Sequence, residues 1–260
     1  MQSGREGVRA QSEGLMTAAQ ISARYPKNWY AAYHARRYAA LLLLLNRYLP
    51  KKDSQRILDI GSSKLTELLH EQFQVPVDTL GFSKDGSTVT GYHYCFDLNE
   101  TLWGESWRTD LPLYDVVVMG EVIEHLYASP ILVLEFIKSL IKPGGMLVLQ
   151  TPNAARLRNR LRLLLGLNPF VHISEDRDYL EHFREYTERE LRMYAAEAGF
   201  EVVECMLSHY FDYRYVSQKQ PTSWETLRGS AVNALFRRLP RNLRTGITLV
   251  MTPVTQSPIT

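Results

Sequence analysis

The sequence is poor in cysteine and lacks the common metal-binding motifs. Its 260 residues include two cysteines, Cys95 and Cys205, both in apolar, strand-like contexts. Because disulfide frameworks and zinc sites need more cysteines at closer spacing, we interpret both as reduced core residues in a reducing compartment. The patterns CxxC and HExxH are also missing, so we expect no bound metal.

The chain also lacks a strong charge of one sign and a long apolar run. Its formal net charge of +2 is too small to favour nucleic acid as a partner. The longest apolar run, residues 39–45, is far shorter than the roughly 20 residues of a membrane span. The N-terminus is polar and has no apolar signal-peptide core. We therefore expect a cytoplasmic protein without a nucleic-acid partner.

Strand and helix patterns alternate along most of the chain. Short runs rich in Val, Leu and Ile are typical of strands buried on both faces of a parallel sheet. Such runs occupy residues 57–60, 77–82, 91–98, 114–120 and 146–151, and two later runs occupy 201–211 and 247–253. Segments with helical spacing, such as 65–73 and 130–141, lie between them. We therefore predict a Rossmann-like, doubly wound α/β fold with a mostly parallel, seven-stranded sheet.

Further segments flank this predicted core. The chain divides into an N-terminal tail and helical cover (1–50), a main domain (51–253) and a C-terminal tail (254–260). In the first part, residues up to about 24 are expected to be frayed, and residues 28–49 have the spacing of a long helix. In the main domain, residues 212–245 are basic, and we expect an irregular insertion before the last strand.

The stretch ILDIGSSKLTELL, residues 57–69, joins a predicted strand to a predicted helix through a Gly-Ser-Ser turn. A dinucleotide would need G-x-G-x-x-G there, because the backbone must approach a pyrophosphate, and an acid at the tip of the second strand. Gly61 stands alone, and the second strand ends without an acid. A cofactor without phosphates needs only a close backbone approach at the turn, which Asp59 could brace by accepting backbone N–H bonds. The turn therefore favours such a cofactor over a dinucleotide.

Several motifs together resemble one enzyme family. ILDIG, FDLNE, YDVVVMGEVIEHL and LIKPGGMLVLQTPN occur in this order, and HFREYTERELRMYAAEAGFEV follows them. They resemble the class I S-adenosylmethionine-dependent methyltransferases over about residues 53–205, in particular the small-molecule methyltransferases with an EVIEH motif. The pair EVIEHL and KPGG…TPN is specific, whereas ILDIG alone would be weak evidence.

The resemblance implies S-adenosylmethionine as the cofactor and a set of residues that bind it. These are Asp59, Gly61, Ser62 and Ser63 along the methionine part, Ser83 or Asp85 at the ribose, Asp97 and Leu98 at the adenine, and Gly120 and Glu121 beside the methyl group. The chain departs from the family where Ser63 and Leu65 replace two of the three glycines of the first loop, and where the ribose acid is displaced or lost. A side chain at a position of positive φ costs on the order of 1 kcal/mol, so we expect this loop to differ locally.

Two histidines are candidates for removing the acceptor's proton. His125 follows the fourth strand together with Glu121 and Glu124. It would act as a general base on an acceptor hydroxyl; the alternative is that Glu124 and His125 cap a helix and hydrogen-bond the sheet edge. His182 is the second candidate, and otherwise it anchors its loop together with Tyr186. The catalytic prediction therefore comprises His125, Glu121 and His182.

Two helices leave further alternatives open. Tyr30, His34 and Arg37 share one face of the first long helix, which we interpret as a solvated polar face in preference to a cover over the cofactor. Residues 155–166 form an arginine-rich amphipathic helix ended by Gly166. That helix either makes weak peripheral contact with a membrane or only aids solubility.

Taken together, these patterns predict methyl transfer from S-adenosylmethionine, at oxygen, to a small-molecule, glycan or lipid-linked acceptor. The choice of oxygen rests on the histidine candidates. The alternative is a catalytically degenerate binding or scaffold protein that keeps the fold without using the cofactor. A nicotinamide oxidoreductase would need the glycine fingerprint that the chain lacks. The oligomeric state is left open.

Overall fold

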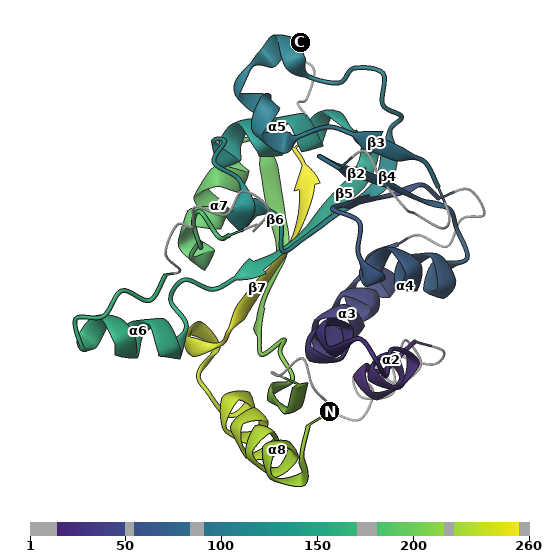
Figure 1. The fold of residues 1–260 in the computed structure, drawn as a ribbon. Coiled ribbons are helices and arrows are strands. Elements are labelled where there is room, and N and C mark those ends of the chain that lie inside the picture. The colour runs from purple at the N-terminus through teal and green to yellow at the C-terminus, as the bar shows by residue number, and fades with distance from the viewer. Residues whose placement is uncertain (1–14, 50–54, 84–90, 171–180, 216–220, 255–260) are drawn as a thin grey trace, which may run out of the picture.

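The computed structural model describes residues 15–49, 55–83, 91–170, 181–215 and 221–254. Within them, seven strands form one sheet in the order β3-β2-β1-β4-β5-β7-β6 (Figure 1). The strands are β1 (Ile57–Ile60), β2 (Val77–Gly81), β3 (His93–Cys95), β4 (Tyr114–Gly120), β5 (Ile141–Pro152), β6 (Phe200–Ser208) and β7 (Gly246–Pro253). Strands β1 to β5 pair in parallel, whereas β7 runs antiparallel to both β5 and β6. The predicted Rossmann-like, mostly parallel sheet of seven strands is confirmed.

Helices cover both faces of this sheet (Figure 1). One face carries α2 (Ala18–Arg24), α3 (Trp29–Tyr48) and α4 (Lys64–Phe73), and the other carries α5 (Pro130–Ser139) and α7 (Glu188–Glu197). Val116 of β4 belongs to the same buried cluster as Leu42 of α3, while Val117 belongs to the cluster of Phe136 of α5. Successive side chains of a strand point to opposite faces, so a strand covered on both sides must be apolar throughout.

The N-terminal helices confirm one expectation and correct another. The long helix predicted over residues 28–49 is α3, which Asn28 caps by accepting a hydrogen bond from the N–H of Ala31 (3.0 Å). The segment expected to be frayed up to about residue 24 contains α2 instead. Thr17 and Gln20 form a reciprocal capping box, and Ile21 is fully buried. One cap and one buried side chain are enough to fix this short helix against α3.

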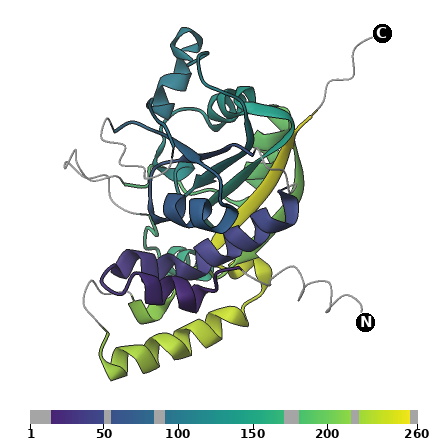
Figure 2. The same ribbon diagram turned by 90° about the vertical axis from the view of Figure 1, so that its right-hand side faces the viewer.

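The C-terminal part corrects a second expectation. Residues 212–245, predicted to be irregular, contain the helix α8 (Ser223–Arg237), which lies outside the sheet beyond the N-terminal helices (Figure 2). Thr222 and Glu225 form its capping box. This helix-start signal is present in the sequence, but the many arginines of the segment favoured the prediction of an irregular insertion. The arginine-rich helix is α6 (Leu157–Leu164), and Gly166 ends it with a positive φ of 69°, as predicted.

Three smaller points complete the comparison. Cys205 is half-buried, but Cys95 is exposed, because its short strand β3 lies at the edge of the sheet; the expectation that both are core residues is therefore wrong for Cys95. Among the helices of the described part, none is long and apolar enough to cross a membrane. Residues 1–14 of the predicted N-terminal tail, and 255–260 of the C-terminal tail, lie outside the described residues.

Candidate active site

A cavity of about 1020 Å³ opens at the carboxyl ends of the parallel strands. Its wall includes the segments that follow β1, β2, β3 and β4, at residues 61–63, 81–83, 97–99 and 120–122. Open α/β sheets bind their ligands in the crevice beyond these strand ends. The volume is at the upper end of the range of small-molecule sites, roughly 300–1,000 Å³. The cavity can therefore hold a cofactor together with part of a second substrate.

The turn after β1 needs only one glycine. Gly61 has a φ of +81°, and a Cβ at this position would lie 3.2 Å from Cγ2 of Val122. Ser63 has an extended backbone, with φ −154°, and its hydroxyl caps α4 by accepting from the N–H of Leu65 (3.1 Å). Because the second position is not left-handed, a serine there carries no backbone strain. Within this turn only Gly61 needs the left-handed conformation, so the serine at position 63 is accommodated.

The residues after the turn leave the crevice open. Leu65, at the start of α4, is buried in the core, and Lys64 forms an ion pair with Glu67 one turn along the helix. Neither Lys64 nor Leu65 is part of the cavity wall, whereas Gly61, Ser62 and Ser63 are. The side chains that replace the family glycines therefore do not fill the space beside the turn.

Asp59 supports the turn from below. It is almost completely buried and does not line the cavity. Its Oδ2 accepts a hydrogen bond from Oγ1 of Thr66 (2.7 Å), which in turn accepts from the N–H of Ser63 (3.2 Å). Asp59 thus braces the loop through a side chain and not, as expected, by accepting backbone N–H bonds directly. Burial raises the pKa of Asp59 to about 7, although Thr66 and Arg37 oppose this shift.

The predicted ribose and adenine positions lie along the next part of the cavity wall. Ser83, Asp97 and Leu98 all line it. Oδ1 of Asp97 accepts from the N–H of Asn99 (2.9 Å), which fixes the turn after β3. Asp85, the second candidate for the ribose, lies outside the described residues. The structure therefore brings three of these four candidates to one cavity.

The first long helix forms another wall of the cavity. Tyr30, His34 and Arg37 all line it, and His34 and Arg37 are buried. The rings of Tyr30 and His34 lie 4.1 Å apart, and burial lowers the pKa of His34, so its imidazole is neutral. The interpretation of this face as solvated is therefore wrong: α3 covers the cavity. The sequence showed that α3 has a polar face, but it did not show that this face lines the cavity.

Glu121 is held in a strained position next to Gly120. It has a φ of +58°, which is uncommon outside glycine and is often associated with functional sites. Its Oε1 lies 3.8 Å from a guanidinium nitrogen of Arg37, and both side chains are largely buried. Burial raises the pKa of Glu121, and the charge of Arg37 opposes this shift. A predicted methyl-facing residue thus lies in the cavity wall beside a buried cation.

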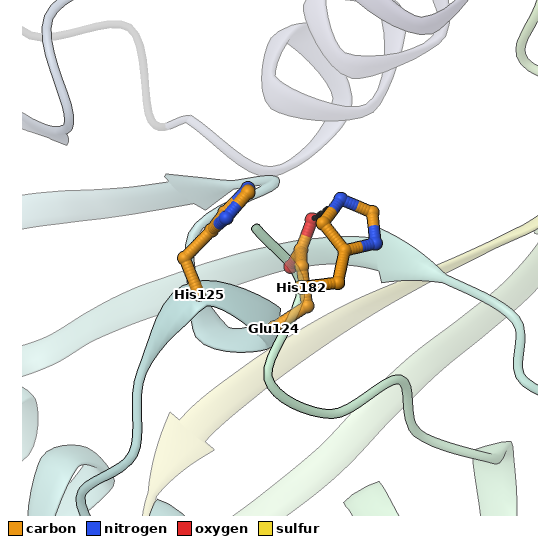
Figure 3. A group of neighbouring side chains, drawn as sticks. All are labelled: Glu124, His125 and His182. Carbon is orange, nitrogen blue, oxygen red and sulfur yellow. Dashed lines mark ion pairs between the residues drawn. The ribbon is translucent and has the colours of Figure 1, made fainter. Parts of the chain in front are cut away.

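Two separate segments bring Glu124, His125 and His182 together (Figure 3). Glu124 and His125 lie on the short 3-10 turn Ile123–His125, and the N–H of Arg184 ties the loop of His182 to the carbonyl of Glu124 (3.2 Å). The two imidazole centroids are 4.7 Å apart in an edge-on arrangement. Both histidines line the cavity, and burial lowers the pKa of His125, which keeps its ring neutral near pH 7.

Glu124 combines features of both earlier interpretations. It is fully buried, and its Oε2 accepts from the hydroxyl of Thr151 on β5 (2.8 Å), as expected for a contact with the sheet. None of the residues that the structure describes forms a hydrogen bond with its Oε1. Tyr186 is also buried, and its backbone pairs with Asn153, so it anchors the loop and does not line the cavity.

The C-terminal part of the wall was not predicted from the sequence. Phe211, Tyr213 and Phe236 line the cavity, and Tyr33 stacks on Phe211 at 5.0 Å between ring centroids. Phe211 was the last residue of the predicted strand 201–211 and follows β6 in the structure, whereas Tyr213 and Phe236 come from the segment 212–245 that was expected to be irregular. The cluster of aromatic residues in this segment was the available signal, but no periodicity pointed it toward the sheet.

Comparison with known proteins supports the assignment of the fold. A family model described as "Methyltransferase domain" matches residues 30–205. Similar solved structures include a complex between the Haloferax volcanii Trm112 methyltransferase activator and the putative methyltransferase (14% identity, 95% of this chain and 97% of that chain, TM-score 0.55). A putative methyltransferase from Bacillus halodurans C-125 is also similar (15% identity, 83% and 100%, TM-score 0.52). No curated protein matches.

A third similar structure has ligands. It is the geranyl diphosphate C-methyltransferase from Streptomyces coelicolor A3(2) in complex with Mg²⁺, geranyl diphosphate and S-adenosyl-L-homocysteine (11% identity, 83% of this chain and 78% of that chain, TM-score 0.52). At these identities the likeness shows the fold alone.

The sheet order, the antiparallel β7 and the cavity at the carboxyl ends of the strands define the class I S-adenosylmethionine-dependent methyltransferase fold. The chain belongs to the methyltransferase-domain family, whose model covers its residues 30–205. The family resemblance predicted from the sequence motifs is confirmed.

Proposed function

We propose that the enzyme binds S-adenosylmethionine across the Gly61 turn and transfers its methyl group to an acceptor hydroxyl. The open cavity above this turn is the observation that supports the proposal most strongly. Ser83, Asp97 and Leu98 would hold the adenosine part, and Ser62 and Ser63 the methionine part. The residues at 120–125 would then face the sulfonium and the acceptor.

The reaction needs alignment more than bond-making groups of the protein. The acceptor oxygen would attack the methyl carbon, so that a C–O bond forms while the C–S bond breaks with its electron pair returning to sulfur. The products would be the methylated acceptor and S-adenosylhomocysteine. In the absence of a metal ion, the hydroxyl proton would pass to His125, or to His182 as the second candidate. Because the sulfonium is an activated donor, holding the two reactants in line supplies most of the acceleration.

The surroundings of the cavity support a lipid-linked acceptor over the small-molecule and glycan alternatives. Arg156 and Arg158, at the start of α6, line the cavity. The same helix exposes Leu164 (82%) and Leu165 (73%) to solvent. An exposed apolar face beside basic residues is typical of peripheral contact with an anionic lipid surface. Such contact would bring the cavity mouth close to a membrane-bound acceptor.

Incubation with methyl-labelled S-adenosylmethionine and fractionated extract tests this proposal. We expect the label in the lipid-extractable fraction, where it is present as a methyl ether of the acceptor. Label in the water-soluble small-molecule or glycan fraction would select one of the other acceptors. Label in no fraction, despite cofactor binding, would contradict methyl transfer.

The alternative of a scaffold protein without cofactor affinity is tested separately by thermal unfolding. A ligand at 100 times its dissociation constant stabilises a protein by roughly 2.7 kcal/mol. We expect such a shift with S-adenosylmethionine or S-adenosylhomocysteine and none with NAD. No shift with millimolar S-adenosylhomocysteine would favour the scaffold.

A further inference from the structure

We infer that Glu124, His125 and His182 form a binding site for one divalent metal ion at the acceptor end of the cavity. The three side chains offer a carboxylate oxygen and two imidazole nitrogens that all lie within 4.8 Å of one another. Figure 3 shows the three side chains pointing to the same side of their backbones, with the His182 ring beside the carboxylate of Glu124.

Hydrogen bonds leave the same nitrogen of both histidines available for a metal. Nδ1 of His125 donates to the carbonyl of Glu181 (2.9 Å), because a carbonyl oxygen can only accept. Nδ1 of His182 donates to the carboxylate of Glu185 (3.3 Å). In each ring Nε2 then carries the free lone pair. This is the arrangement in which a second residue fixes the tautomer and orientation of a metal-binding histidine.

The carboxylate that supports His182 is itself held in place. Oε1 of Glu185 accepts from Arg156 (2.8 Å), and its Oε2 accepts from Asn159 (3.1 Å). Glu185 is buried, so this group of hydrogen bonds lies within the protein. Glu185 thus orients the proposed metal-binding residue His182, and Arg156 and Asn159 orient Glu185.

Glu124 provides an independent observation that points to a cation at this place. It is fully buried, yet within the described part of the chain its Oε1 has no hydrogen-bond partner, and it faces Nε2 of His182 at 4.0 Å. Among the residues that the structure describes, no lysine or arginine forms an ion pair with it. A buried carboxylate oxygen without a partner is costly. A cation between Glu124 and the two imidazoles would satisfy it.

The ligand set indicates the kind of ion. Two imidazoles and one carboxylate suit first-row divalent ions such as Zn²⁺ or Mn²⁺ better than Ca²⁺, which prefers oxygen ligands only. Ligands about 2.1 Å from a tetrahedral ion lie about 3.4 Å apart, so the side chains must approach by roughly 1 Å. His182, whose side chain is 31% exposed, can make this adjustment by rotation. Three protein ligands leave an open position, which is typical of catalytic metal sites.

The role of the ion rests on the proposed function, whereas its binding does not. The open position would face the cavity, where His125 and His182 form part of the wall. An acceptor hydroxyl bound there would have a lowered pKa, and its proton would pass to water. Nε2 of His125 would then be a metal ligand and not a general base. Loss of activity in a His125 variant cannot separate these roles, but metal binding can.

Metal titration of the chelator-treated, full-length protein tests the inference. With Zn²⁺, Mn²⁺ and Mg²⁺ in separate calorimetric titrations, we expect one tightly bound Zn²⁺ or Mn²⁺ per chain. Glu124→Gln and His182→Ala should each weaken binding at least about 100-fold, and Glu185→Gln about 10-fold or more through its support of His182. His70→Ala, on α4 outside the cavity, is the matched control and should bind as the wild type does. Co²⁺ absorption provides a second readout, since its visible bands report nitrogen and oxygen ligation.

Circular dichroism and cooperative thermal unfolding show that each variant is folded, independently of cofactor binding. No bound metal, or equal binding by the wild type, Glu124→Gln and His182→Ala, would overturn the site and leave an adventitious ion only. If S-adenosylhomocysteine binds and metal does not, this inference fails and the proposed function stands. If metal binds and S-adenosylhomocysteine does not, the proposed function fails and the metal site stands.

Discussion

The buried carboxyl group of Asp59 makes a specific prediction about the pH dependence of stability. Its pKa is raised from 3.8 to about 7 by burial, so the folded protein binds this proton more tightly than the unfolded chain. The stability that the proton contributes is complete below pH 3.8 and is lost as the pH rises through 7. Asp59→Asn removes the proton equilibrium but keeps an oxygen that can accept from Thr66.

The size of the effect follows from the shift. One pH unit corresponds to about 1.4 kcal/mol for a single proton. The free energy of unfolding of the wild type, relative to Asp59→Asn, should therefore fall by about 3 kcal/mol between pH 5 and pH 8. Urea unfolding of both proteins at several pH values measures this, and comparing the two cancels the other titrating groups. If the difference in the free energy of unfolding between the two proteins stays constant from pH 5 to pH 8, within the error of the urea extrapolation, the raised pKa of Asp59 is refuted.

Four further substitutions test other parts of the account. Asp59→Ala leaves Thr66 without its acceptor and should abolish binding of S-adenosylhomocysteine, so wild-type affinity would contradict the bracing role. Gly61→Ala places a Cβ at φ +81°, 3.2 Å from Val122, and should cost about 1–2 kcal/mol of stability in urea unfolding, with weaker cofactor binding. His125→Ala should spare cofactor binding but lower kcat roughly 100-fold or more, and normal turnover would exclude His125 from the chemistry. Leu164→Glu should reduce co-sedimentation with anionic vesicles at low salt, whereas Leu227→Glu on α8 should not; a wild type that fails to pellet would refute membrane contact.

The parts of the fold that local patterns determine were predictable from the sequence. β1 and β4 are largely buried on both faces, so they appear as short, mostly apolar runs interrupted only by Asp59 and Asp115, and α3 shows its buried face at helical spacing. The same holds for the turn after β1, where a single Gly61 next to two serines already disfavoured a dinucleotide loop. These features depend on neighbours in the chain, and a single sequence contains them.

The parts that depend on contacts between distant segments were not predictable. His182 joins Glu124 and His125 because Arg184 bonds the carbonyl of Glu124 and His125 bonds the carbonyl of Glu181, and no ligand spacing in the sequence reveals these contacts. The polar face of α3 appeared to be solvated because its partners, Glu121 and Phe211, lie far along the sequence. α8 was missed for another reason: the density of arginines outweighed a capping signal that was present.

The account depends on a cofactor that lies against the carboxyl ends of the strands, and amide hydrogen exchange tests this directly. With saturating S-adenosylhomocysteine, we predict slower exchange in the cavity segments 61–66, 97–99 and 120–125, and little change in α6 and α8. Protection elsewhere in the chain, or unchanged exchange at all three segments, would contradict the account.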